Sequence, residues 1–255
     1  MIRQKTPIAS ALIGLILFLL GAPLALAGNL IVDGSFENPV VPVGTFENFN
    51  PGDSIGGAWT VLGSTPGSPA VNLVQTTYNE PFNNNVHFPA EDGLNSLDLT
   101  GPSNTGPNSG VQQSVSTLAG QGYELSFYVG VAAGAPVYST PSTVDLSING
   151  GSSVGYTNSN LVSGTVTWEL FTTTFVATGS TTTITFLNGD STNNYNGLDN
   201  VQLVTASSVP EPSTLVLLAC SLPAIIGVFQ SRRRGNHLAA TTWPRTCAGR
   251  SGPSE

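Results

Sequence analysis

Asp199 is the residue whose position in this chain most directly suggests chemistry. Within Leu198–Val204 it shares strand parity with Val201 and Leu203, so a strand there would turn its carboxylate inward. A buried carboxylate needs a partner, and the stretch from Gly28 to Ala206 contains no Lys or Arg. The partners that remain are backbone N–H groups, a hydroxyl group or a metal ion.

A second group of residues has the types needed for acid–base chemistry. Glu80, Glu91 and Asp92 flank His87 in the sequence. One imidazole cannot anchor a multi-His metal site, and neither a Ser elbow nor a cysteine nucleophile is present in this stretch. We therefore expect no catalysis. A glycoside-acting enzyme stays open as an alternative, because glycoside hydrolysis needs only a suitably spaced pair of carboxylates.

Aromatic residues fall into two groups that suggest different roles. Trp59 and Trp168 lie in strand-like segments, so we expect them to pack in the core rather than stack on a sugar. The aromatics in loop-like stretches, where an exposed ring could stack on a sugar, are Tyr78, Phe82, Tyr138 and Tyr195. The sequence singles out none of these four.

The elements that must position these residues are β-strands. Apolar and polar residues alternate through the chain, and turn clusters such as 101–107 separate the alternating segments. The predicted strands cover or include 58–62, 71–74, 97–99, 111–115, 123–129, 143–149, 168–176, 184–186 and 198–204. Nine or ten short strands of this kind predict an all-β fold, an antiparallel β-sandwich of the jelly-roll type.

The charge of this central stretch excludes several partners. Thirteen Asp and Glu and no Lys or Arg give residues 28–206 a formal charge of −13. Nucleic acid and anionic lipid surfaces are excluded, because both need cationic side chains. Neutral polysaccharide and divalent cations remain. The two cysteines, Cys220 and Cys247, lie outside this stretch, so no disulfide can hold the domain together.

The first 27 residues have the order of a secretory signal. Arg3 and Lys5 precede an apolar run, and Ala25 and Ala27 supply small residues at −3 and −1. This pattern predicts a signal helix over 1–27 with cleavage before Gly28. An uncleaved N-terminal membrane anchor is the alternative.

The C-terminal segment has three parts in order. Pro210, Glu211 and Pro212 lie in a short linker, an apolar run covers 214–229, and an arginine cluster follows, formed by Arg232, Arg233 and Arg234. The apolar run predicts a helix somewhat short for a bilayer span, and the arginines favour a cytoplasmic C-terminal side. We expect at least transient membrane contact.

The segment 209–234 resembles a PEP-CTERM sorting signal. The resemblance implies recognition and cleavage near Pro210–Pro212 by an exosortase, in a Gram-negative bacterium that makes exopolysaccharide. It divides the chain into a signal peptide (1–27), a β-sandwich domain (28–206), the sorting segment (207–234) and a tail (235–255). The tail extends beyond the usual end of such signals, and we expect it to be disordered.

The central domain resembles exported proteins of the choice-of-anchor C type, whose sandwich is similar to galactose-binding-like carbohydrate-binding modules. The matching segments are Asn29–Glu37, Ala58–Val61, Ser96–Gly101, Gly122–Phe127 and Gly197–Val201. Such sandwiches commonly hold a structural Ca²⁺ where the first and last strands meet. The resemblance therefore implies Asp199 and Glu37 as calcium ligands, since Ca²⁺ takes hard oxygen donors.

Taken together, the sequence predicts an exported, non-catalytic protein of the cell envelope or extracellular matrix, associated with exopolysaccharide or another glycan. A structural or adhesive surface protein without a defined ligand is the first alternative. The glycoside-acting enzyme is the second.

Overall fold

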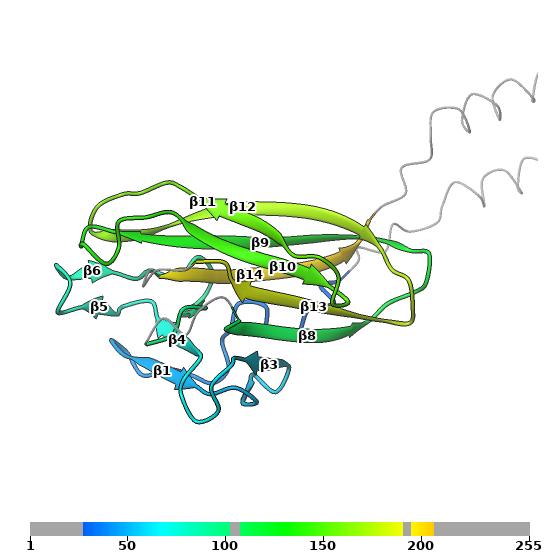
Figure 1. Ribbon diagram of the computed structural model, residues 1–255, viewed down its shortest axis with the longest axis horizontal. Coiled ribbons are helices and arrows are strands. Elements are labelled where there is room, and N and C mark those ends of the chain that lie inside the picture. The colour runs from blue at the N-terminus through cyan, green and yellow to red at the C-terminus, as the bar shows by residue number, and fades with distance from the viewer. Residues whose placement is uncertain (1–27, 103–107, 191–194, 207–255) are drawn as a thin grey trace, which may run out of the picture. The chain divides into compact units, whose positions relative to one another are not determined.

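The computed structural model describes residues 28–102, 108–190 and 195–206, which contain fourteen strands. Figure 1 shows their arrangement. The predicted signal helix and cleavage site, the sorting segment with its apolar helix, and the tail all lie outside these residues, apart from Gly28 itself. Among the described residues, no helix has the length and apolar character needed to cross a bilayer.

The larger sheet has eight strands in the order β1-β4-β7-β14-β9-β12-β6-β5. Neighbours pair antiparallel, except for a single parallel pair of β12 with β6 at Thr165 and His87. Its strands are β1 (Phe46–Phe49), β4 (Val71–Gln75), β5 (Asn79–Glu80), β6 (Val86–His87), β7 (Asn95–Asp98), β9 (Gly122–Ala133), β12 (Thr165–Val176) and β14 (Asn196–Thr205).

The smaller sheet has six strands in the order β11-β10-β13-β8-β3-β2, all antiparallel. Its strands are β2 (Ser54–Ile55), β3 (Trp59–Leu62), β8 (Gly110–Ser116), β10 (Ser142–Ile148), β11 (Val154–Asn158) and β13 (Thr181–Asn188). The two sheets enclose one main core, so the predicted antiparallel β-sandwich is confirmed.

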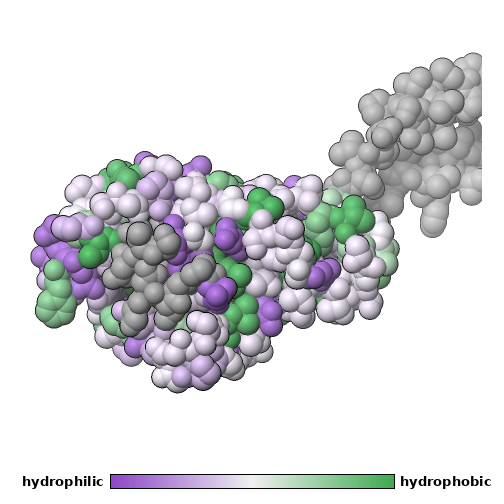
Figure 2. Space-filling model, viewed as in Figure 1, coloured by the Kyte–Doolittle hydropathy of each residue, from purple (hydrophilic) through white to green (hydrophobic). Residues whose placement is uncertain are grey.

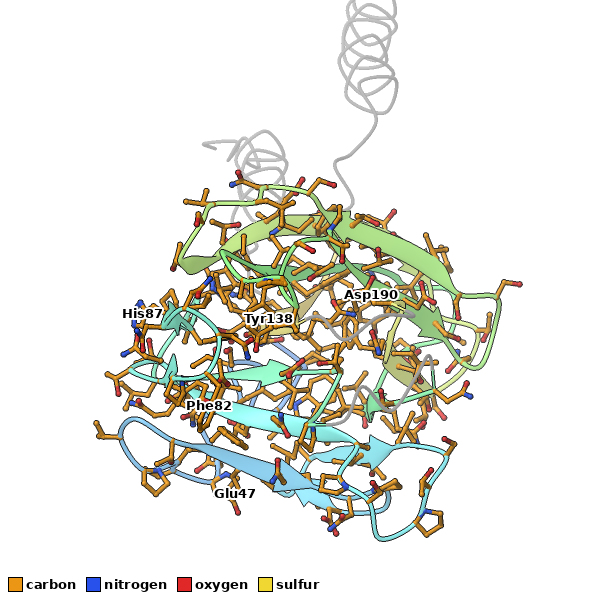
Figure 3. All side chains as sticks on the ribbon, turned by 60° about the vertical axis from the view of Figure 1, so that its left-hand side comes forward. Glu47, Phe82, His87, Tyr138 and Asp190 are labelled. Carbon is orange, nitrogen blue, oxygen red and sulfur yellow. The ribbon has the colours of Figure 1, made fainter. Side chains whose placement is uncertain are left out.

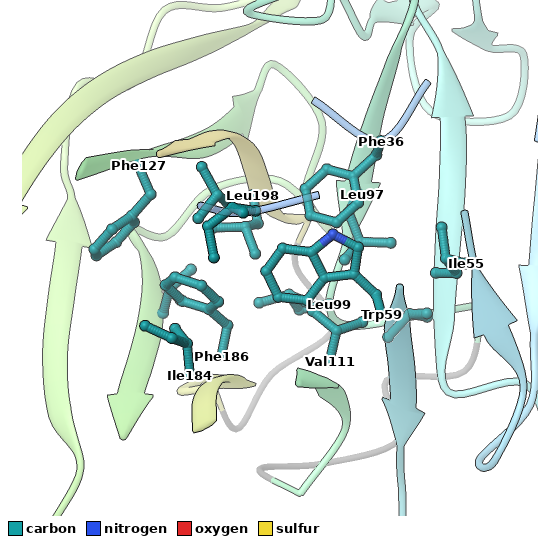
Figure 4. Packing of buried hydrophobic residues seen from close by; sticks show 14 of the residues in the cluster. Phe36, Ile55, Trp59, Leu97, Leu99, Val111, Phe127, Ile184, Phe186 and Leu198 are labelled. Carbon is teal, nitrogen blue, oxygen red and sulfur yellow. The ribbon is translucent and has the colours of Figure 1, made fainter. Parts of the chain in front are cut away.

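Aromatic rings from both sheets fill the centre of this core (Figure 4). Phe127 of β9 and Phe186 of β13 meet edge to face, with ring centroids 4.9 Å apart. The ring centroid of Trp59 on β3 lies 6.2 Å from that of Phe186 and 5.4 Å from that of Phe36. The Trp59 Nε1–H donates a hydrogen bond to the Asp33 carbonyl oxygen at 2.9 Å. Trp59 is fully buried. It packs in the core, as predicted.

The larger sheet carries packed side chains on both of its faces, because successive residues of a strand point to opposite sides. On β4, Val71 and Leu73 point into the main core, while Asn72 and Val74 point to the other side of the sheet. Val74 belongs to a separate apolar cluster on that side. The larger sheet is therefore covered on its outer face too, and that face carries the candidate site.

Each of the nine predicted strand segments overlaps a strand of the structure. The strands that the sequence did not reveal are β1, β2, β5, β6 and β11; four of them lie at a sheet edge, and β6 lies next to one. Three of them have only two residues, too few for alternation to be visible.

Replacing Phe127 with Ala should destabilise the sandwich strongly. The ring is fully buried among other rings, and a Phe-to-Ala change at such a site lowers the free energy of unfolding by about 3–5 kcal/mol. Phe82→Ala is the matched control. Its ring is 90% exposed, and the change should cost less than about 0.5 kcal/mol. Urea unfolding of both variants measures the difference, and equal losses would contradict this assignment of the core.

Candidate functional site

A pocket of about 330 Å³ opens on the outer face of the larger sheet, and we call it the aromatic pocket. Its floor comes from β4 and β7, through Asn72, Val74 and Asp98. Its walls come from the β5–β6 hairpin, the loop after β9 and the residue preceding β14. The remaining lining residues are Phe46, Tyr78, Glu80, Phe82, Asn83, Phe88, Thr100, Gly101, Pro102, Val137, Tyr138 and Tyr195.

The walls hold a connected set of aromatic rings. Phe88 lies at its centre, with ring centroids 5.7 Å from Tyr78, 5.6 Å from Tyr138 and 5.0 Å from Tyr195. Phe46 extends the set beyond Tyr78, at 5.3 Å. Three of these four contacts are edge to face, the geometry that the quadrupoles of aromatic rings favour. Each ring is thereby held in place by its neighbours.

Phe82 extends from the tight turn of the β5–β6 hairpin. Asn84 and Asn85 in that turn both have positive φ, 58° and 54°, which Asn tolerates better than most residues. The Phe82 ring is 90% exposed, although it belongs to the pocket lining. Figure 3 shows Phe82, His87 and Tyr138 in this part of the domain. An exposed ring at a pocket rim can contact a ligand without rearrangement of the core.

Hydrogen-bond acceptors form the polar part of the aromatic pocket. Asn72 is buried, and its Oδ1 has no hydrogen-bond partner. Glu80 is half-buried and accepts from the Tyr78 hydroxyl at 2.7 Å and the Phe82 amide at 3.1 Å. Asp98 accepts through Oδ1 from the Thr100 amide and hydroxyl, at 3.0 and 2.8 Å. A buried acceptor without a donor, such as Asn72 Oδ1, is costly unless a ligand or water satisfies it.

Burial raises the pKa values of two groups in this pocket, Asp98 and Tyr138. Desolvation raises the pKa of Asp98 to about 6, against the Thr100 and Asn196 hydrogen bonds that lower it. Desolvation also raises the pKa of Tyr138 above its usual range, with the Asp98 and Glu80 charges adding to the effect. Tyr138 therefore keeps its proton, and Asp98 ionises close to neutral pH.

The four aromatics of the loop-like stretches all reach this pocket: Tyr78, Phe82, Tyr138 and Tyr195 line it together. Tyr195 is buried and its hydroxyl hydrogen-bonds to Ser96 at 2.9 Å, so it is a wall rather than a rim residue. Trp168 packs against the same apolar cluster and donates from Nε1 to the Pro89 carbonyl oxygen at 2.9 Å. It is a packing residue, as predicted.

The sequence did not identify Asn72 and Asp98 as site residues. Each is a polar residue between two core-facing ones, in Val71-Asn72-Leu73 and Leu97-Asp98-Leu99. That pattern alone indicates a strand with one wet face. Only the hairpin and the loop after β9, which cover this face, show that the two polar side chains are buried in a pocket.

Asp199 and Glu37 hold one loop from two sides. Asp199 is fully buried; its Oδ2 accepts from the Glu91 and Asp92 amides at 2.8 and 3.1 Å, and its Oδ1 from the Asn200 amide at 2.7 Å. Glu37 Oε1 accepts from the next amides of the same loop, those of residues 94 and 95, at 2.8 and 3.0 Å. We call this arrangement the carboxylate clamp.

The predicted strand parity of Asp199 with Val201 and Leu203 is wrong, because a β-bulge between Asp199 and Gln202 interrupts the alternation. Leu198 and Val201 both face the main core, so Asp199 lies on the outer face of the sheet and is buried by the loop that it holds. Of the three partners that the sequence left open for Asp199, the backbone N–H is the one seen.

The clamp offers the hard oxygen donors that Ca²⁺ requires, but both Asp199 oxygens and Glu37 Oε1 already accept from backbone N–H groups. Within the described ranges, no group of three or more His, Cys, Asp or Glu side chains is arranged to hold a metal. Calcium prefers six to eight oxygen ligands. A calcium ion here would thus have to share Asp199 and Glu37 with the loop amides, and the predicted site stays a prediction.

Glu80, Glu91 and Asp92, which flank His87 in the sequence, do not gather around it as a group of three or more metal-binding side chains among the described residues. His87 lies on β6, opposite Asn79 and Thr165. Glu91 accepts from Asn200 Nδ2 at 2.8 Å and Asp92 from the Ser35 hydroxyl at 2.7 Å, both near the carboxylate clamp. Glu80 alone of these acids lines the aromatic pocket.

Removing the Asp199 side chain should destabilise the domain. Asp199→Ala leaves three backbone N–H groups without their acceptor, at a cost of about 2–4 kcal/mol. Glu47→Ala, which truncates an acidic side chain at an exposed site on β1, should leave stability nearly unchanged. Chemical unfolding at neutral pH compares the two. If the two variants have equal stabilities, the clamp does not stabilise the domain.

The same residue gives stability a defined pH dependence. Burial raises the Asp199 pKa to about 8, compared with 3.8 for an ordinary Asp. The folded state thus holds this proton more tightly than the unfolded chain, so the free energy of unfolding falls as pH rises from about 4 to about 8. Urea unfolding across this range should show a shallower fall in Asp199→Ala than in the parent. An unchanged slope would exclude Asp199 as its source.

Comparison with known proteins gives matches by structure alone. Neither a protein-family model nor a curated protein matches this sequence. Several solved structures are similar to it in fold, at low sequence identity. One is a candidate sugar-binding protein from Bacteroides thetaiotaomicron, with 12% identity and a TM-score of 0.43 over 70% of this chain and 100% of that one.

Two further matches contain carbohydrate-binding modules. TmCBM61, in complex with β-1,4-galactotriose, has 17% identity and a TM-score of 0.41 over 70% of this chain and 99% of that one. A GH26-CBM35 β-(1,4)-mannanase from Podospora anserina has 12% identity and a TM-score of 0.38 over 66% of this chain. The match spans only 29% of the mannanase chain.

Proposed function

We propose that this domain is a non-catalytic glycan-binding module and that the aromatic pocket is its binding site. One observation carries the proposal. Aromatic residues from two separate stretches of the sequence, Tyr78 and Phe82 in one and Tyr138 in the other, converge on a pocket whose floor carries the buried acceptor Asn72. Ligand sites of this kind combine apolar walls with a few fixed polar groups.

The chemistry of the pocket suits a sugar. A pyranose presents a C–H face, which packs on an aromatic ring, and a rim of hydroxyls, which donate and accept hydrogen bonds. Phe82 supplies an exposed ring, and Asn72, Glu80 and Asp98 supply acceptors. Figure 2 shows mostly hydrophilic or weakly apolar surface on the face in view, with apolar residues in small separate groups, as expected of a domain that binds polar ligands.

Binding without catalysis is favoured by how the acidic groups are used. Glu91 and Asp92 hydrogen-bond to Asn200 and Ser35 near the carboxylate clamp, whereas His87 of β6 pairs with Asn79 and Thr165. Glu80 and Asp98 share the pocket, but each already accepts hydrogen bonds from protein donors. Reducing-end release from a bound oligosaccharide, lost in Glu80→Gln, would instead support the glycoside-acting alternative.

The ends of the chain suggest where such a module acts. The signal-like segment ending at Ala27 and the PEP-CTERM-like segment around Pro210–Pro212 support export, recognition by an exosortase, and residence in the envelope or matrix. An exopolysaccharide made by the same cell is then the nearest glycan. Fractionation of cells with and without the segment 209–234 tests this: equal distribution of both forms would contradict sorting.

Loss of the Phe82 ring should weaken glycan binding without unfolding the domain. Isothermal titration with neutral β-linked tetra- to hexasaccharides should show about five- to ten-fold weaker binding for Phe82→Ala, since one aromatic stacking contact contributes roughly 1 kcal/mol. Tyr138→Ala should act in the same direction. Leu170→Ala is the control, because Leu170 is exposed on β12, away from the pocket. Binding that is unaffected in both aromatic variants would remove the pocket from the proposal.

A calcium ion shared between Asp199 and Glu37 is a separate proposal with its own test. A ligand that binds only the folded state must raise stability. If the proposal holds, the melting temperature should rise when about 1 mM CaCl₂ replaces EDTA, and Glu37→Gln should reduce the rise. Melting curves that coincide in CaCl₂ and EDTA would rule it out.

A further inference from the structure

The aromatic pocket is rich in hydrogen-bond acceptors. Asn72 Oδ1 is an acceptor without a partner, and Asp98 and Glu80 contribute carboxylate oxygens. Two of the hydroxyl donors nearby are already used, because Tyr78 donates to Glu80 and Thr100 donates to Asp98. A ligand that fits this polarity must itself donate hydrogen bonds.

The pocket is also negatively charged, with no cationic side chain to balance it. Residues 28–206 contain no Lys or Arg. Asp98 is buried and stabilised only through N–H and O–H dipoles at Oδ1, from Thr100 and the Asn196 amide. In a low-dielectric pocket an unpaired carboxylate is costly, so a positively charged ligand group would stabilise it.

The aromatic rings of the walls also favour a positively charged ligand. The faces of aromatic rings attract cations within about 6 Å of the ring centre, most strongly where water is excluded. Phe46, Tyr78, Phe82 and Tyr138 line the pocket together. Two carboxylates, one unpartnered amide oxygen and several ring faces all favour an ammonium group over a neutral hydroxyl.

We propose that the glycan bound in the aromatic pocket carries a free, protonated amine, so that the preferred ligand is an amino sugar. The inference rests on the proposed function and names the sugar class for that site. The amine lies against Asp98 and Glu80, and the pyranose ring packs on Phe82. Uronic acids and sulfated sugars are excluded, because their anions would face two carboxylates with no cation to receive them.

The pH dependence expected of such a site agrees with the ionisation of Asp98. Its pKa is about 6 in the absence of ligand, and a neighbouring ammonium group would lower it. Affinity for an amino sugar should therefore rise as pH increases from about 5 to about 6.5. The groups that face Asp98 are Thr100 from its own strand end, Asn196 and Tyr195 from the start of β14, and Tyr138 with Glu80 across the pocket.

Three tetrasaccharides with the same β-1,4-glucan backbone test the inference, because they differ at C2 alone. Cellotetraose carries a hydroxyl there, chitotetraose an acetamido group, and the glucosamine tetramer an amine. Titration of the purified full chain at about pH 6.5 should give at least about ten-fold tighter binding of the glucosamine tetramer than of cellotetraose. Added NaCl should reduce that preference.

Variants assign the preference to the two carboxylates. Asp98→Asn keeps the Oδ1 acceptor but removes the charge, and it should bring the glucosamine and cellotetraose affinities within about three-fold of each other. Glu80→Gln provides the same test if Asp98→Asn does not fold, as judged by its thermal melt. Glu47→Gln removes one charge from exposed β1 and should retain the full preference.

The outcomes separate this inference from the proposed function. If cellotetraose binds as tightly as the glucosamine tetramer, glycan binding stands and the amine preference is wrong. If none of the three binds, and a panel of neutral oligosaccharides also fails, both are wrong. If spermidine binds as tightly as the glucosamine tetramer, the pocket recognises the amine without the sugar, which overturns the amino-sugar assignment.

Discussion

The structure depends on stabilising carboxylates without cations. Residues 28–206 have thirteen acidic side chains and neither Lys nor Arg, so buried Asp98 and Asp199 can be stabilised only by N–H and O–H dipoles. Asp199 accepts hydrogen bonds from the backbone amides of residues 91 and 92, and Glu37 accepts from those of residues 94 and 95. The two carboxylates thus hold one loop. The N-terminal segment, the last strand and the start of β7 are thereby joined.

This junction also positions the aromatic pocket. The clamped loop leads directly into β7, whose last residue is Asp98, and β7 pairs with β4, which carries Asn72. Ser96 of β7 anchors the hydroxyl of Tyr195. The floor of the pocket and its Tyr195 wall are therefore connected through β7 to the loop that the carboxylate clamp holds. A displacement of the clamped loop would therefore be transmitted to Asp98 through β7, which has only four residues.

The Tyr195 side of the pocket is supported by Trp168, whose ring packs closely against the backbone of two glycines. The Trp168 ring lies against Gly130 and Gly197, on neighbouring strands, where a Cβ would come within 2.6 and 2.8 Å of it. The indole can approach only because both residues lack a side chain. Trp168 in turn meets Tyr195 edge to face, with centroids 6.4 Å apart. The aromatic set of the pocket thus extends into the packing of the sheet.

The sequence by itself determined the class of fold, because alternation of apolar and polar residues is local and reports directly on strands with one buried face. It also determined that Asp199 would need a partner, since no cation was available. Only the tertiary structure decided which partner it has, and which strand faces become a pocket. The β5–β6 hairpin is too short to show a pattern, and the aromatic residues Tyr78, Phe82, Tyr138 and Tyr195 lie up to 117 positions apart. Their convergence depends on strand pairing and loop packing, which are long-range interactions that no local pattern encodes.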